Sequence, residues 1–342
     1  WTPRNDGIGI TQFYYGSVSP DGGSVIGGTQ DNGTIFLLDG ESQNEWKTTS
    51  SGDGGNAYFR PTNANQYYTS YIHGQIERAT VANSTQLTPL NSSAFEFIPK
   101  LHYYPGAVPG VGEQLLLCGR TGLFMINPAT HPANTAPTQI FNAATDITEI
   151  ERASFNPEHA WVGGPTLGLL KTNTLTDGNQ NDWADVTPAG FPSRTVSDIE
   201  IVNSNRVYVS LMGYEFKNLW RTSDGGNTWQ NLHVKGTLPQ VPISSVKVLR
   251  SRIDGSGQVD TLAVATDIGV FISFDSGNTW QASTGGMGTV VVEDLFFDPT
   301  REYLYAVTHG RGMFRSSLPM TADLVLAGRG TNLVGGQPVG LT

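Results

Sequence analysis

The sequence is poor in several residue types, and each scarcity excludes something. Cys118 is the only cysteine, so the chain cannot form an internal disulfide. Its position in the apolar run from Leu115 predicts a buried thiol. No apolar stretch reaches the roughly 18 to 20 residues of a membrane span, which argues against membrane insertion. Helical patterns are almost absent, so an all-α or α/β fold is not expected.

Charge is also sparse, and its sign excludes one class of partner. Only 15% of the residues are charged, the net charge is -10, and the 20 Lys and Arg residues are scattered along the chain. A polynucleotide partner needs a cluster of cations that displaces counterions from phosphates, so nucleic acid is not expected. The six histidines form no HExxH motif and no close pair, so neither a zinc site nor any cofactor is predicted.

The chain is rich in turn-forming residues. It contains 41 Gly and 19 Pro among 342 residues, with abundant Thr, Ser and Asn. This composition is typical of many short strands joined by tight turns. Two similar octets, Thr222–Trp229 (TSDGGNTW) and Ser273–Trp280 (SFDSGNTW), stand about fifty residues apart. In each we expect a turn between two strands, with the Asp side chain accepting bonds from backbone amides, Gly226 or Gly277 at positive φ, and the Trp opening the next strand.

The octet pattern S/T-x-D-x-G-x-T-W resembles the Asp-box of the bacterial neuraminidase repeat, a signature of β-propellers. The resemblance implies an all-β, seven-bladed propeller with four strands in each blade. Strand-like segments recur at the spacing of roughly 40 to 50 residues expected for blades. Seven such units fit within residues 1–317. The last unit has no fourth strand of its own, and Trp1–Pro3 looks like the end of an Asp-box, so we expect this N-terminal strand to join the last blade and close the ring.

Residues 318–342 do not fit a blade. The segments ADLVL and GGQPVGLT resemble the first two strands of immunoglobulin-like repeats in bacterial surface proteins. Two strands cannot bury a sandwich core. This extension is therefore either a truncated module, a disordered segment, or a strand that pairs with another subunit and allows self-association.

Three unusual loops are predicted to meet at one end of the propeller channel. They hold Gln30, Asp31 and Asn32 in the first blade, Asp53 before the second, and His309 with Arg311 in the seventh. Equivalent turns carry His73, Arg120 and Asp267, and Tyr214 lies in a long loop where it could stack on a sugar ring. A structural interpretation is also open: Asp and Asn beside Gly serve tight turns, and Arg311 pairs with Asp31 or Asp53.

The segments GGTQDNGT, GDGG and THGRGMF also resemble a group of secreted propellers related to sortilin-type receptors and family 74 xyloglucanases. That resemblance implies extracellular or cell-surface work on glycans or proteins. We expect mainly a binding module. The alternatives are a glycoside hydrolase of xyloglucanase type, with Asp31 and Asp53 as its carboxylates, and a structural subunit of a surface layer or filament assembled through residues 318–342.

Two further sites receive little support. A sialidase would need three arginines that bind a carboxylate, and Phe59–Pro61 is the one segment that resembles the Arg-Ile-Pro signature of that family. Asp177, Asn179 and Asn181 alternate like the start of a calcium loop but lack the later Glu. A degenerate Asp-box turn is the favoured interpretation of that segment.

Overall fold

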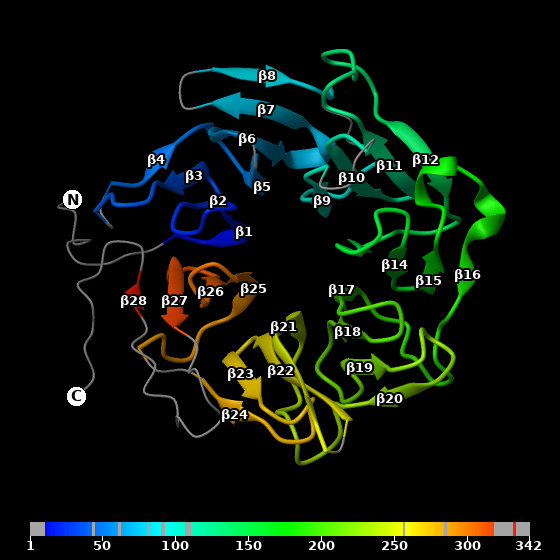
Figure 1. The fold of residues 1–342 in the computed structure, drawn as a ribbon. Coiled ribbons are helices and arrows are strands. Elements are labelled where there is room, and N and C mark those ends of the chain that lie inside the picture. Colours follow the sequence, from blue (N-terminus) through cyan, green and yellow to red (C-terminus); the bar gives the residue numbers. More distant parts are fainter. Residues whose placement is uncertain are drawn as a thin grey trace. The chain divides into compact units, whose positions relative to one another are not determined.

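A computed structural model describes residues 11–42, 45–60, 63–80, 83–89, 93–106, 111–255, 257–283, 286–317 and 331–332. It contains seven four-stranded antiparallel sheets arranged as a seven-bladed β-propeller, which confirms the predicted fold (Figure 1). The single cysteine is buried, as expected. No helix among the described residues is long and apolar enough to cross a membrane.

The strands follow one another in chain order within each sheet. The first three sheets are β1 (Phe13–Val18), β2 (Val25–Thr29), β3 (Gly33–Leu37) and β4 (Lys47–Thr48); β5 (Gly54–Arg60), β6 (Asn63–Tyr71), β7 (Ile76–Thr80) and β8 (Ser84–Gln86); and β9 (Leu101–Tyr104), β10 (Gln114–Gly119), β11 (Gly122–Ile126) and β12 (Thr138–Asn142). The next two are β13 (Glu149–Arg152), β14 (Ala160–Gly164), β15 (Gly168–Thr172) and β16 (Ala184–Asp185); and β17 (Val196–Ile201), β18 (Val207–Leu211), β19 (Leu219–Thr222) and β20 (Trp229–Asn231).

The last two sheets are β21 (Ile243–Asp254), β22 (Gly257–Thr266), β23 (Gly269–Ser273) and β24 (Gln281–Ala282); and β25 (Val292–Asp298), β26 (Tyr303–Thr308), β27 (Met313–Ser317) and β28 (Thr331–Asn332). Three short 3-10 helices complete the described elements: η1 (Ile72–Gly74), η2 (Leu175–Asp177) and η3 (Gln180–Asp182).

The fourth strand of the last sheet is β28, which comes from the C-terminal segment and pairs Thr331 with Arg315 of β27. The predicted N-terminal strand at Trp1–Pro3 lies outside the described residues, as does most of the extension at 318–342. We expected the extension to lie outside the blades, but Thr331–Asn332 pairs with the last blade.

The chain divides into two compact units, residues 1–67 with 249–342 and residues 68–248. In the first unit, strands far apart in sequence lie side by side, because β1 packs against β25 (Figure 1). In the second unit, β13 packs against β17 in the same way. Neighbouring blades thus bury their inner strands against each other.

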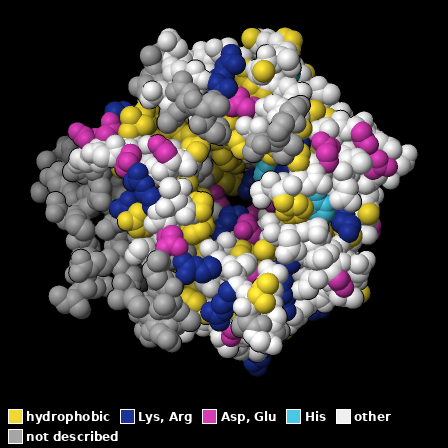
Figure 2. Space-filling model, in the orientation of Figure 1, with side chains coloured by type: hydrophobic (Ala, Val, Ile, Leu, Met, Phe, Trp, Pro, Cys, Tyr) yellow, Lys and Arg dark blue, Asp and Glu magenta, His cyan; other side chains and the backbone are white. Residues whose placement is uncertain are grey.

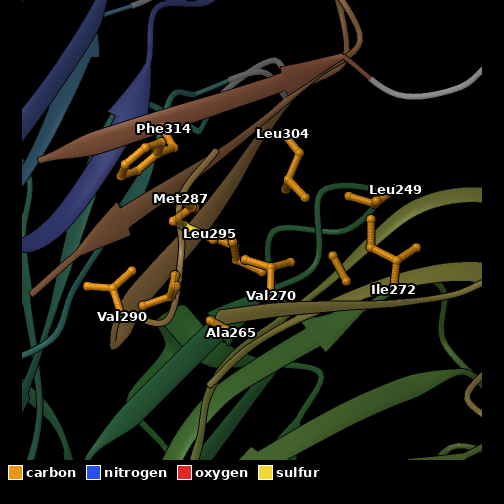
Figure 3. Packing of buried hydrophobic residues seen from close by; sticks show 12 residues of the cluster. Leu249, Ala265, Val270, Ile272, Met287, Val290, Leu295, Leu304 and Phe314 are labelled. Atoms are coloured by element: carbon orange, nitrogen blue, oxygen red, sulfur yellow. The ribbon is translucent and has the colours of Figure 1, made fainter. Parts of the chain in front are cut away.

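Apolar side chains fill the space between neighbouring sheets. One cluster joins the sheet of β21–β24 to that of β25–β28, and it includes Leu249, Val270, Leu295 and Phe314 (Figure 3). Each of these residues is at most 6% exposed. Side chains along a strand point alternately to the two faces of the sheet, so each blade has apolar side chains on both faces. A blade is therefore stable only when a neighbouring blade covers each face.

The two octets form turns with the same hydrogen bonds. In the second, the Asp275 carboxylate accepts bonds from the Thr279 amide at 2.8 Å and the Thr279 hydroxyl at 2.6 Å. The Ser273 hydroxyl donates to Asp275 and accepts from the Gly277 amide, and Gly277 has a φ of 90°. Asp224 makes the corresponding bonds to Thr228 in the first octet. The predicted turn geometry is confirmed in both.

Candidate functional site

Three loops of the first unit meet where the sequence predicted a polar site. An isolated parallel bridge joins Asn32, in the β2–β3 turn, to Gly52, in the connection from β4 to β5. The Gly33 amide donates to the Gly52 carbonyl at 2.6 Å. His309, which begins the β26–β27 turn, bridges to Gln12 just before β1. The backbone itself therefore holds these loops together.

Glycine permits this close approach. A Cβ atom on Gly28 would lie 1.8 Å from the Gly55 carbonyl oxygen, and one on Gly33 would lie 1.8 Å from that of Ser50. Gly33 also has a φ of 73°, which L side chains rarely adopt. Asp31 itself adopts a left-handed φ of 60°. The glycines beside Asp31 are thus required by the contact between the first two sheets.

Three carboxylates act on the phenol of Tyr14 at this junction. The Asp31 amide donates to Asp53 Oδ1 at 3.1 Å, and Tyr14 hydrogen-bonds the Asp53 carboxylate. Burial raises the pKa of Tyr14, and the negative charges of Asp53, Asp31 and Glu293 raise it further. The phenol therefore keeps its proton at neutral pH and donates to Asp53.

Glu293 in turn contacts the histidine of the third loop. The distance from His309 Nδ1 to Glu293 Oε1 is 2.5 Å, and half of the His309 side chain is exposed. Asp31 is exposed and Asp53 is half-buried. The cluster of Tyr14, Asp31, Asp53, Glu293 and His309, called the acidic mouth below, is therefore fixed by backbone contacts yet open to solvent.

The other predicted residues of the first unit have different surroundings. Gln30 and Asn32 are exposed, and the Asn32 amide group donates to the Gln30 carbonyl at 3.2 Å. Arg311 donates to the Met287 carbonyl at 2.8 Å, and no ion pair to Asp31 or Asp53 is present among the described residues. Asp267 is half-buried in the β22–β23 turn. The proposed structural pairing of Arg311 with either aspartate is therefore not observed.

His73 belongs to the second unit, where its ring packs against Phe97 with ring centres 5.6 Å apart. Two more predicted residues belong to this unit. Arg120, in the β10–β11 turn, pairs with Glu96 at 3.1 Å. Tyr214, in the β18–β19 loop, is 69% exposed. A ligand-binding role for either residue stays a prediction, as it does for every residue of the acidic mouth.

The calcium-like segment is a hydrogen-bonded turn. Asp177 Oδ1 accepts from the Asn179 amide at 2.8 Å, and Asn179 Oδ1 accepts from the Asn181 amide at 3.1 Å. These oxygens are used by the segment's own backbone, an arrangement typical of Asx turns. Within the described ranges, no group of three or more His, Cys, Asp and Glu side chains is arranged to hold a metal ion.

Sequence reasoning missed Tyr14 and Glu293. Tyr14 stands in the aromatic run Phe13–Tyr15. Because all three side chains are aromatic, the alternation of polar and apolar residues that marks the buried face of a strand is missing there. Glu293 is the second residue of β25, and Asp53 directly precedes β5, so both lie near the connection that enters their blade. A comparison of the residues at the start of the first strand in each blade could have predicted Glu293 as a neighbour of Asp53.

Charged side chains of both signs are mixed on the face drawn in Figure 2. The acidic mouth itself is a local cluster of five side chains, of which three are acidic. A local cluster of this kind favours recognition of individual polar groups over long-range attraction of a polyion.

No protein-family profile and no curated protein matches this chain. Similar solved structures exist. The GH74 xyloglucanase from Xanthomonas campestris has a TM-score of 0.65 and 15% identity, over 90% of this chain and 52% of that one. An extracellular domain from B. thetaiotaomicron has a TM-score of 0.58 and 12% identity, over 89% of this chain and 38% of that one. The RRP9 WD40 repeats have a TM-score of 0.58 and 10% identity, over 87% and 88%.

These similarities show the propeller fold. The chain spans 38% and 52% of the lengths of the extracellular domain and the xyloglucanase, respectively. Propellers with such low identity host many functions, so the site has to carry the functional argument.

Proposed function

We propose that this chain is a non-catalytic binding module of an extracellular or cell-surface protein and that its acidic mouth binds a glycan. The observation that carries the proposal is the junction at Asp53. Its carboxylate offers about four acceptor positions, and the Tyr14 hydroxyl and the Asp31 amide occupy two of them. The remaining positions face a half-exposed site and suit the hydroxyl groups of a sugar.

The neighbouring groups support this ligand class. The Asp31 carboxylate makes no hydrogen bond to another described residue, and it is exposed. The imidazole of His309 is half exposed beside Glu293, so donors and acceptors are both present. Sugars are typically bound by a few fixed polar groups of this kind beside an aromatic ring, here that of Tyr14.

A hydrolase is the second candidate function. The similarity to a xyloglucanase and the placement of Asp31 and Asp53 on adjoining loops favour it. A glycosidase needs an acid whose pKa is raised and a second carboxylate across a cleft, roughly 5 to 10 Å away. Asp53 instead accepts hydrogen bonds from Tyr14 and from the Asp31 amide, so part of its carboxylate is already engaged in holding the two loops together. We therefore place binding first.

The test is a glycan array followed by calorimetric titration of the best ligand. The variants Asp31→Asn and Asp53→Asn change a carboxylate to an amide of the same shape, and each should weaken binding by about tenfold or more because a charge-assisted bond is lost. Asp21→Asn is the matched control, since Asp21 is exposed in the β1–β2 turn at the other end of the same blade.

The proposal fails if both mouth variants bind as the wild type does. It also fails if the protein releases reducing ends from xyloglucan and Asp53→Asn abolishes that release, because hydrolysis would then be the function.

A further inference from the structure

A polar cavity lies in the first unit, away from the acidic mouth. It has a volume of about 120 Å³, and its lining includes Val25, Leu37, Asp39, Glu41, Tyr305 and Arg315. Val25 begins β2 and Leu37 ends β3, whereas Asp31 lies in the turn that joins the other ends of these strands. The cavity therefore sits at the opposite end of the first blade, beside β26 and β27.

The ionic groups of the cavity are paired, with one exception. Asp39 accepts two bonds from the Arg301 guanidinium, at 2.9 and 2.6 Å. Glu41 pairs with Lys47. The Arg315 guanidinium lies 4.3 Å from the centre of the Tyr303 ring, and among the described residues it forms no ion pair. The cavity thus has one positive charge that is not matched by a salt bridge.

Tyr305, which also lines this cavity, has a buried hydroxyl group beside the Arg315 guanidinium. The Tyr305 ring is fully buried and stacks on Phe296, with the ring centres 4.7 Å apart. Within the described ranges, its hydroxyl group makes no hydrogen bond of acceptable geometry. A buried hydroxyl left unbonded costs roughly 1 to 3 kcal/mol, so a ligand or solvent that bonds it is favoured.

The state of this hydroxyl suits an anionic ligand. Burial raises the pKa of Tyr305, and this outweighs the opposite effect of the nearby Arg315. The phenol consequently stays protonated and can donate a hydrogen bond. Arg315 is also a donor only. A ligand that accepts bonds and carries a negative charge therefore matches both groups.

We propose that this cavity binds a carboxylate end group, held by the Arg315 guanidinium and the Tyr305 hydroxyl. Its volume is well below the roughly 300 to 1,000 Å³ of pockets that enclose a whole drug-sized ligand, so only the end of a larger molecule enters. A planar guanidinium matches a carboxylate through two parallel bonds. The carboxylate could belong to a uronic acid or to an acidic peptide, and the chemistry at the cavity is the same.

The experiment is a calorimetric or NMR titration at constant ionic strength. Sodium glucuronate and an acetylated peptide ending in Asp represent the two sources, and glucose is the neutral control. Saturable binding of either carboxylate, at least about tenfold tighter than glucose, is expected. The stronger of the two identifies the source.

Two variants test the assignment. Arg315→Met keeps an apolar stem over Tyr303 and should weaken carboxylate binding by about tenfold or more. Tyr305→Phe removes a hydroxyl that makes no hydrogen bond of acceptable geometry within the described ranges, so it should leave the melting temperature unchanged or raised while it weakens binding severalfold. Arg252→Met, which replaces an exposed arginine of β21, is the matched control and should leave this binding unaltered. Absence of carboxylate binding, or equal binding by the wild type and Tyr305→Phe, would overturn the proposal.

Discussion

At the scale of single residues, the inner strands of the second unit carry buried charges where apolar side chains would be expected. Glu149 is 1% exposed and lies 3.0 Å from the Lys100 ammonium. Asp198 is equally buried and accepts bonds from the Ser245 hydroxyl, the Val246 amide and the Lys247 ammonium, at 2.6 to 2.9 Å. Two buried acids of one unit thus differ in the number of donors they receive.

The difference in donors separates their pKa values. Burial raises the pKa of Glu149 to about 8, because it outweighs the attraction of Lys100. For Asp198, burial also disfavours the charge, but Lys247, Lys100 and the hydrogen bonds prevail and lower the pKa. The number of donors around a buried carboxylate, more than its burial, decides whether it is ionised.

Glu149→Gln should therefore change how stability depends on pH. Between about pH 4.5 and 8 the folded protein holds a proton on Glu149 that the unfolded chain has released, so the free energy of unfolding falls as pH rises through this window. The variant lacks this effect. Relative to the wild type, it should gain stability from pH 5 to pH 8, by about 1.4 kcal/mol for each unit of pKa shift. Urea unfolding at several pH values measures the difference.

Asp198→Asn provides the contrasting variant. A lowered pKa means that the Asp198 carboxylate stabilises the fold above the unfolded pKa of 3.8 and that this contribution is lost in acid. The variant should therefore have a lower free energy of unfolding than the wild type at neutral pH, and this difference should become smaller below pH 4. Parallel pH profiles for wild type and Glu149→Gln would contradict the raised pKa of Glu149.

At the scale of elements, the octet turns connect the third and fourth strands of two blades. Asp275 and its Thr279 partner fix the turn, and Trp280 follows it immediately before β24. In the first octet, Trp229 packs against Trp161 of the preceding blade, with ring centres 5.9 Å apart, and its indole donates to the Val186 carbonyl at 2.9 Å. The turns thus position tryptophan side chains that pack in the protein, which is a structural role.

Asp275→Ala should lower the free energy of unfolding by about 1 to 2 kcal/mol, because the Thr279 amide and hydroxyl lose their acceptor. Urea unfolding at pH 7 measures the change. Asp21→Ala, in an exposed turn of another blade, is the matched control and should have little effect. The glycan affinity of Asp275→Ala should equal that of the wild type. A loss of stability no larger than that of the control would show that the turn does not depend on this side chain.

At the scale of the whole molecule, the sequence predicted the features that repeat. The two octets and the strand spacing set the blade register, and the turn positions of Asp31, Asp53 and His309 were enough to predict that their loops meet. Tyr14 could not be assigned, because an aromatic run does not reveal which ring lies beside the aspartates of the neighbouring loops. The pairing of Arg311 with the Met287 carbonyl depends on a loop conformation that no repeat specifies.

The fourth strand of the last sheet could not be predicted either, because it does not follow the repeat. Thr331–Asn332 stands in a segment without blade-like spacing, so local patterns gave no reason to pair it with β27. The pairing depends on a backbone edge that only the folded chain presents, since Met313–Ser317 would otherwise expose unpaired amides and carbonyls.

This edge leads to a prediction about residues 318–342. A chain that ends at Ser317 loses β28 and leaves the outer edge of β27 open. We expect it to be less stable by on the order of 1 kcal/mol for each ladder hydrogen bond lost, and to associate more strongly as concentration rises. Light scattering after size exclusion measures the association.

A second variant separates edge protection from assembly through the extension. Replacing Thr331 and Asn332 by proline keeps the length of the chain but removes two backbone donors, so it should reproduce the behaviour of the shortened chain. If the extension instead serves as a strand that joins subunits, the shortened chain should associate less than the full chain does. The direction of the change in association therefore decides between a segment that covers the edge of its own blade and one that links copies of the protein.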